Sequence, residues 1–132
     1  MLKVYVYVDG SDLDEVSCQL VEAFTNFLHT WGISSARLVN DKFPRTADLR
    51  DNDLPQWNLG LNFEAERLSP TEFDQLMSFL SRTAAETQRE FAIGGYGPTS
   101  QFTEDWDFVG THLEPLKLQF LRDLLVGNER SV

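Results

Sequence analysis

Few side chains in this sequence have the type and spacing that catalysis or metal binding requires. It contains one cysteine, Cys18, and two histidines, His29 and His112. Cys18 and His29 fall on one predicted helix, and a rise of about 1.5 Å per residue places them roughly 16 Å apart. They therefore cannot form a nucleophile–base pair. These three residues also lack the spacing of metal ligands, so we expect no metal site, no cofactor and no catalytic residue.

Carboxylates are more abundant, and they gather in short segments. One segment, Asp48 to Asp53, lacks the turn glycine and the distal glutamate of a calcium-binding loop. A later segment mixes acidic with aromatic residues, and we expect Trp106 either to anchor a partner there or to pack into the core from an edge. The predicted partner-binding surface consists of Asp48, Asp51, Asp53, Phe102, Glu104, Asp105, Trp106, Asp107 and Phe108.

The composition makes the whole chain acidic. Its 21 Asp and Glu residues exceed its 11 Lys and Arg residues, for a net charge of −10. Both halves of the chain share this excess. Such a field repels nucleic acid and anionic membranes, because phosphate binding needs basic residues that displace counterions. The charge favours a basic protein partner, or it serves only to keep the protein soluble.

Cysteine use and the N-terminal residues suggest the compartment. A single cysteine forms no intrachain disulfide, and residues 1–9 alternate instead of forming the apolar stretch of a signal peptide. No segment has the length of a membrane span. We therefore expect a cytoplasmic protein that forms one domain over residues 1–132.

Two alternating strands are the clearest elements that would position these side chains. Apolar residues alternate with polar ones over residues 2–9 and again over residues 56–66. This pattern is typical of strands with one buried and one wet face. If the wet faces lie on the same side of the sheet, they form an alternative ligand site that contains Tyr5, Tyr7, Asn58 and Asn62.

Helices are predicted between the strands. The first starts at Ser11 or Asp12, and the second starts at a capping box formed by Ser69 and Glu72. Two further strands are predicted over residues 34–40 and 90–94, the second ending in a glycine-rich turn at 94–98. The order βαββαβ predicts an α+β, ferredoxin-like fold in which the first and third strands lie in the middle of the sheet.

Three segments fall outside this unit. Residues 41–54 are predicted to form a long polar loop, and residues 101–109 a loop or a short edge strand. Residues 111–127 are predicted to form a C-terminal helix, capped by Thr111, whose apolar residues spread over about 200° of arc. We expect this helix to lie across the open face of the sheet; the alternative is a partner contact or a homodimer interface.

Two functional hypotheses follow. In the first, the chain is a small acidic protein-binding module, and its size and charge are typical of immunity proteins that neutralise a basic toxin or nuclease. In the second, it is a regulatory or enzymatic domain that binds a small molecule on the open face of the sheet. A concave pocket on that face favours the second hypothesis, whereas a flat face counts against it.

Overall fold

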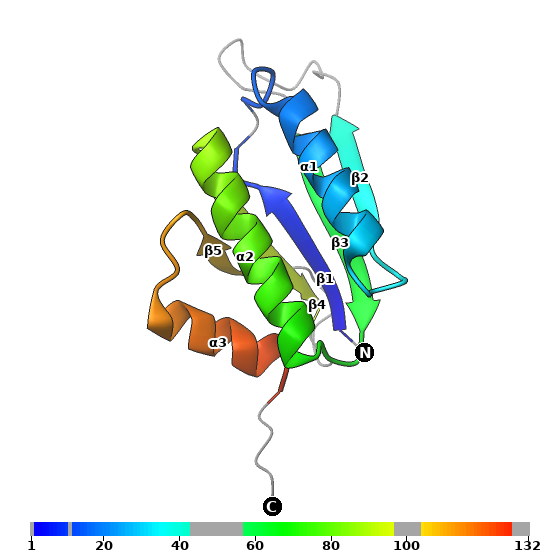
Figure 1. Cartoon of the computed structure of the whole chain (residues 1–132), viewed down its shortest axis with the longest axis vertical. Coiled ribbons are helices and arrows are strands. Elements are labelled where there is room, and N and C mark those ends of the chain that lie inside the picture. Colours follow the sequence, from blue (N-terminus) through cyan, green and yellow to red (C-terminus); the bar gives the residue numbers. More distant parts are fainter. Residues whose placement is uncertain (1, 11, 43–56, 97–103, 128–132) are drawn as a thin grey trace, which may run out of the picture.

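A computed structural model describes residues 2–10, 12–42, 57–96 and 104–127 of the chain. Within these residues the protein is an α+β structure with a five-stranded antiparallel sheet and three helices (Figure 1). The sheet has the order β2-β3-β1-β4-β5, so the first and third strands lie side by side in its interior. The elements in chain order are β1 (Leu2–Val8), α1 (Ser17–Thr30), β2 (Arg37–Lys42), β3 (Trp57–Ala65), α2 (Pro70–Thr87), β4 (Phe91–Tyr96), β5 (Glu104–Val109) and α3 (Pro115–Leu125).

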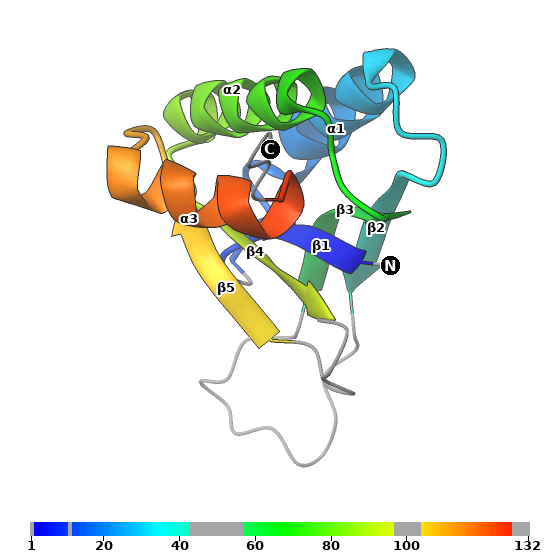
Figure 2. The ribbon, with the colours of Figure 1, turned by 90° about the horizontal axis from the view of Figure 1, so that it is seen from below.

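The sheet is therefore larger than the four-stranded one predicted. β5 pairs with β4 and extends the sheet at that edge. The segment had been predicted as a loop or an edge strand, and the edge strand is confirmed. All three helices lie on one side of the sheet, and no described helix covers the other side, which is called the open face below (Figure 2).

The core lies between the sheet and the helices, as the alternation in β1 and β3 predicts. Val6 of β1 and Leu61 of β3 pair across the two strands, and neither is exposed to solvent. Burying apolar side chains on one face stabilises the sheet by roughly 25 cal/mol for each Å² removed from water. The remaining core residues of these two strands are Val4, Val8, Leu59 and Phe63.

Helix α2 begins at the predicted capping box. The Ser69 hydroxyl accepts from the Glu72 N–H at 3.1 Å, and the Glu72 carboxylate accepts from the Ser69 N–H at 2.9 Å. Phe79 lies off the main apolar stripe of this helix but is buried, because its ring stacks on Phe27 of α1 at 4.3 Å. Phe79 thus joins the two helices.

Two predicted boundaries on the N-terminal side were wrong. Helix α1 starts at Ser17, not near residue 12, because Leu13 is fully buried and its carbonyl closes a turn with the N–H groups of Val16 and Ser17. Strand β2 starts later than predicted and extends to Lys42, because it continues to pair with β3 as far as Trp57. Two residues assigned to the polar loop 41–54 therefore belong to a strand.

The predicted glycine-rich turn at 94–98 was also placed too early. Gly94 and Gly95 belong to β4 and pair with Tyr5 and Val4 of β1. A Cβ on Gly95 would lie 2.0 Å from the Lys3 carbonyl oxygen. Glycine is required here because the neighbouring backbone comes too close, which a sequence pattern cannot distinguish from a turn.

Helix α3 begins at Pro115, with Glu114 instead of Thr111 at the N-cap position. Proline fits the first turn, but deeper in a helix it would remove a hydrogen bond and clash with the preceding turn. The helix does not cover the open face, so that expectation was wrong. It lies beside α2 and over β5 (Figure 2), with Leu121 and Leu125 buried in the core.

Candidate functional site

The open face of the sheet carries a group of polar and aromatic side chains that are joined by hydrogen bonds. The rings of Tyr5 and Tyr7 stack with their centroids 4.9 Å apart. The Tyr7 hydroxyl donates to Oδ1 of Asn62 at 2.8 Å, and the Tyr5 hydroxyl donates to Oδ1 of Asp105. These bonds join β1 to β3 on one side and to β5 on the other, so the tyrosine rings have fixed positions.

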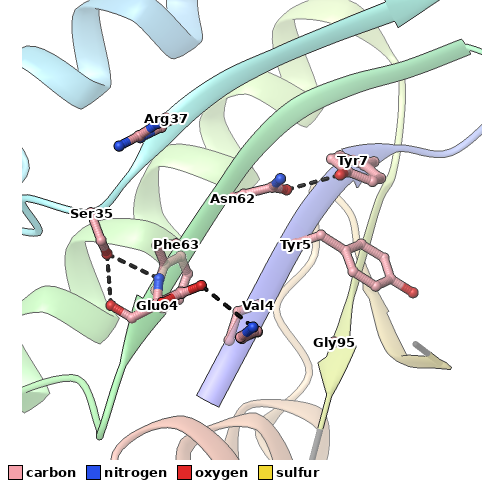
Figure 3. A pocket seen from close by; sticks show the side chains of 10 residues that line it. Val4, Tyr5, Tyr7, Ser35, Arg37, Asn62, Phe63, Glu64 and Gly95 are labelled. Carbon is pink, nitrogen blue, oxygen red and sulfur yellow. Dashed lines mark hydrogen bonds and ion pairs between the residues drawn. The ribbon is translucent and has the colours of Figure 1, made fainter. Parts of the chain in front are cut away.

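A depression of about 580 Å³ lies on this face (Figure 3). Its volume is within the range of small-molecule sites, which are roughly 300–1,000 Å³. Strands β1, β2, β3 and β4 all contribute to it. The residues that line it are Lys3, Val4, Tyr5, Tyr7, Ser35, Arg37, Asn62, Phe63, Glu64 and Gly95.

The charges in the depression are unevenly paired. Lys3 and Glu64 form an ion pair, with Nζ and Oε1 3.8 Å apart. Arg37 forms no ion pair or side-chain hydrogen bond with another described residue. Within an acidic molecule, the residues that line this depression therefore include one positive charge without an ion-pair partner among the described residues.

Ser35 fixes the part of the depression next to Arg37. Its hydroxyl donates to the Glu64 carbonyl oxygen at 2.6 Å and accepts from the Glu64 N–H at 2.9 Å. Figure 3 shows this pair of bonds beside the β3 backbone. The hydroxyl is thus already occupied by the backbone, and Arg37 and Asn62 are the nearby groups with donors to offer a ligand.

The Tyr7 hydroxyl has an altered acidity. Burial raises the pKa of Tyr7 above its ordinary value of 10.0, and the negative charge of Asp41 acts in the same direction. The hydrogen bond with Asn62 opposes both effects. With its pKa raised, Tyr7 remains a neutral hydrogen-bond donor at neutral pH.

The structure brings together part of the predicted ligand site. Tyr5, Tyr7 and Asn62 all line the depression, whereas Asn58 pairs with Asp41 farther along β3 and does not. Lys3 and Arg37 were missed. Alternation already placed Lys3 on the face of the two tyrosines, but the position of Arg37 depends on the pairing between β2 and β3.

The predicted partner-binding surface is divided in the structure. The Asp105 carboxylate is bonded to Tyr5, and Asp107 forms an ion pair with Lys117 of α3 at 3.8 Å. Trp106 packs against the core, and Phe108 is 38% exposed. Glu104 belongs to β5 by its backbone. Asp48, Asp51, Asp53 and Phe102 lie outside the described residues.

A second exposed surface lies on α3, and it was assigned to a partner contact only as an alternative. Leu116 is 86% exposed, and Phe120, one turn later, is 46% exposed. The cations of this helix are engaged within the protein, because Lys117 pairs with Asp107 and Arg122 pairs with Asp74 at 2.8 Å. The exposed side of α3 therefore carries two large apolar side chains, and Glu114 and Asp123 near them form no ion pair with a described residue.

No described residue forms an ion pair or a side-chain hydrogen bond with the cysteine or with either histidine. Cys18, His29 and His112 are all exposed. Among the described residues, no three His, Cys, Asp or Glu side chains are grouped to hold a metal ion. The described helices also include none that is both long and apolar enough to cross a bilayer.

Comparisons with protein-family models, with curated proteins and with solved structures found no match to this chain. The functional argument therefore depends on the two exposed surfaces alone.

Proposed function

We propose that this chain is a non-catalytic, cytoplasmic binding protein that holds a basic protein partner, and that it neutralises a basic toxin or nuclease in this way. In this proposal the scaffold is a ferredoxin-like unit extended by β5 and α3. The outer face of α3 is the contact surface. The observation that carries the proposal is the exposure of Leu116 and Phe120 on neighbouring turns of one helix.

Apolar exposure of this kind favours a partner contact. An isolated exposed leucine is common on protein surfaces, but two large side chains four residues apart on one helix face form a patch. Leu124 on the same helix is partly buried, as is Leu113, which precedes the helix. Amphipathic helices bind partner grooves through such spacing, with anchors at i and i+4.

The charge around the patch favours a basic partner over a second copy of this chain. Glu114 and Asp123 are exposed at the two ends of the patch, and neither forms an ion pair with a described residue. A second copy would bring the same carboxylates and a further charge of −10. A groove bordered by lysine or arginine complements the patch, and charge complementarity also speeds association.

The acidic loop remains part of the proposal as a second contact. Asp48, Asp51 and Asp53 lie outside the described residues, so their contribution is still a prediction from sequence. Phe108 is exposed on β5, but it pairs with Ala92, which pairs with Tyr7, so it lies on the open face and offers only a separate aromatic contact there. Trp106 is not required as the anchor, because it packs against the core.

A two-stage binding experiment tests the proposal. Proteins retained by the immobilised chain from its host are identified, purified and titrated by calorimetry against the wild type and the double variant Leu116→Ala, Phe120→Ala. We expect a basic partner whose affinity falls at least tenfold in the double variant, since central anchors contribute about 2 kcal/mol or more. We also expect the affinity to fall as salt rises.

Leu38→Ala is the matched control, because Leu38 is 38% exposed on the distant edge strand β2. It should leave the affinity unchanged. The proposal fails if no retained protein depends on Leu116 and Phe120, or if the dependent partner is acidic. It also fails if light scattering shows a homodimer that the double variant dissociates.

A further inference from the structure

We propose that the depression on the open sheet face is a binding site for a small carboxylate with a planar apolar body. This site is on the opposite side of the sheet from α3, so it is independent of the proposed partner contact. Three features support the proposal: an unpaired arginine, an amide with free donors, and a fixed pair of aromatic rings.

The unpaired arginine is Arg37, on the edge strand β2. Its guanidinium has no ion-pair partner among the described residues, although the chain has an excess of carboxylates. Lys3 and Glu64 neutralise each other nearby, so Arg37 carries the unpaired charge among the residues that line the depression, while the Asp105 carboxylate is bonded to Tyr5 and the Asp41 charge acts on Tyr7. A guanidinium presents its donors in a planar fork that matches the two oxygens of a carboxylate.

The amide belongs to Asn62, which pairs directly with Arg37 across β2 and β3. Paired residues point to the same face of a sheet, with Cβ atoms about 5 Å apart. Tyr7 donates to the Asn62 carbonyl oxygen, which fixes the amide orientation. The Asn62 NH₂ group bonds to no described residue and is free to donate to an anion beside Arg37.

The aromatic part of the site is the stacked pair Tyr5 and Tyr7. Each hydroxyl is bonded, to Asp105 and to Asn62 respectively, so neither ring needs to be reoriented to receive a ligand. A planar apolar group can pack against these rings while its carboxylate reaches Arg37 and Asn62. Aromatic pairs add about 0.5–1.5 kcal/mol beyond the area they bury, so the planar body contributes to affinity.

The charges of the lining residues disfavour other classes of ligand. A cation would meet Lys3 and Arg37 in the depression, and a neutral ligand would gain nothing from the Arg37 charge. A large polyanion would be repelled by the net charge of −10. A ligand with a single negative charge satisfies Arg37 at the smallest electrostatic cost.

The test uses benzoate as the probe in a titration followed by backbone amide chemical shifts. Benzoate should shift the amides of residues 3–7, 35–37 and 60–64 with a single dissociation constant. Arg37→Met should weaken binding roughly tenfold, the usual loss when one charged hydrogen-bond donor is removed. Benzamide, which has the ring without the charge, and acetate, which has the charge without the ring, should both bind more weakly than benzoate.

Two further variants separate this site from a general charge effect. Asn62→Asp retains an acceptor for Tyr7 but removes the amide donors and adds a negative charge, so it should abolish benzoate binding. Arg82→Met removes an exposed arginine on α2 that forms no ion pair with a described residue, and it should leave binding unchanged. Equal affinity in wild type and Arg37→Met, shifts centred elsewhere, or the absence of saturation would each overturn the proposal.

Discussion

The hydroxyl of Tyr5 on β1 bonds to the carboxylate of Asp105 on β5, two strands away across β4. Tyr5 pairs with Gly94, and Gly94 in turn pairs with Asp105, so the three residues form one row across the sheet. The tyrosine reaches Asp105 because Gly94 has no side chain between them. This row fastens the added edge strand to the centre of the sheet.

A double-mutant cycle on Tyr5 and Asp105 should detect this bond. We expect Tyr5→Phe and Asp105→Ala to be coupled by about 1 kcal/mol in the free energy of unfolding, the net value of a typical hydrogen bond. Urea unfolding of the wild type, both single variants and the double variant measures the coupling. Additive effects would show that the bond contributes nothing to stability.

Gly60 should tolerate no side chain. A Cβ on Gly60 would lie 1.8 Å from the Val6 carbonyl oxygen, and a β-strand backbone cannot move away without breaking its pairing. We expect Gly60→Ala to lower the free energy of unfolding by about 2 kcal/mol or more, as overpacking typically does. Gly32→Ala is the control, because its Cβ would meet only the Glu72 carboxylate at 3.5 Å. Equal stabilities of the two variants would contradict this account.

Tyr7 should make stability depend on pH in the alkaline range. Its pKa is raised in the folded state, chiefly by burial and also by Asp41, so the unfolded chain loses the proton first as pH rises. The stabilising contribution is therefore complete below about pH 10 and is lost as pH increases through the folded pKa. Urea unfolding at a series of pH values measures the effect in the wild type and in Tyr7→Phe.

Below pH 9 to 10 the free energy of unfolding of the wild type should exceed that of Tyr7→Phe by a constant amount, because the variant also loses the hydrogen bond to Asn62. Above that range the difference should narrow, since only the wild type has the Tyr7 proton to lose. A difference that stays constant to the highest pH would show that the Tyr7 pKa is not raised.

The capping box of α2 should contribute measurably to stability. Ser69→Ala removes the acceptor for the Glu72 N–H, and we expect a loss of about 1 kcal/mol in the free energy of unfolding. Thr111→Ala is the matched control, because α3 begins after Thr111 and Glu114 occupies its N-cap position. Thermal unfolding should show a lower midpoint for the first variant and an unchanged midpoint for the second.

Alanine substitutions on the buried and the exposed side of α3 should have different effects on stability. Leu121 is fully buried, so Leu121→Ala should leave a cavity and lower the free energy of unfolding by about 2–5 kcal/mol. Leu116 is 86% exposed, and Leu116→Ala should change the free energy of unfolding by less than about 0.5 kcal/mol. Denaturant unfolding of both variants measures this difference. A large loss at Leu116 would mean that its side chain is packed in solution.

Arg122 contributes polar contacts that hold α3 against α2. It pairs with Asp74 of α2, and its guanidinium also lies 4.9 Å from the centroid of the Phe73 ring. The Leu68 N–H donates to the Leu125 carbonyl oxygen at 2.8 Å, which fixes the end of the helix. These contacts explain why α3 joins the helical side of the sheet although its apolar arc is wide enough to suggest other positions.

The sequence alone determined the elements whose signals are local. Alternation over residues 56–66 predicted β3 to within one residue at each end, because side chains of a strand alternate between two faces whatever surrounds it. The capping box at Ser69 was likewise visible, since its donors and acceptors lie within three residues. The wet face that contains Tyr5, Tyr7 and Asn62 followed from the same alternation.

Only the tertiary structure decided which distant residues meet on that face. Arg37 lies opposite Asn62 through the pairing of β2 with β3, and Asp105 bonds to Tyr5 from a strand that the sequence pattern left ambiguous. Gly94 and Gly95 resembled a turn because glycine occurs in the sequence both at turns and where two backbones approach closely. The side of the sheet on which α3 packs depends on contacts with Asp74 and the core, which no local pattern contains.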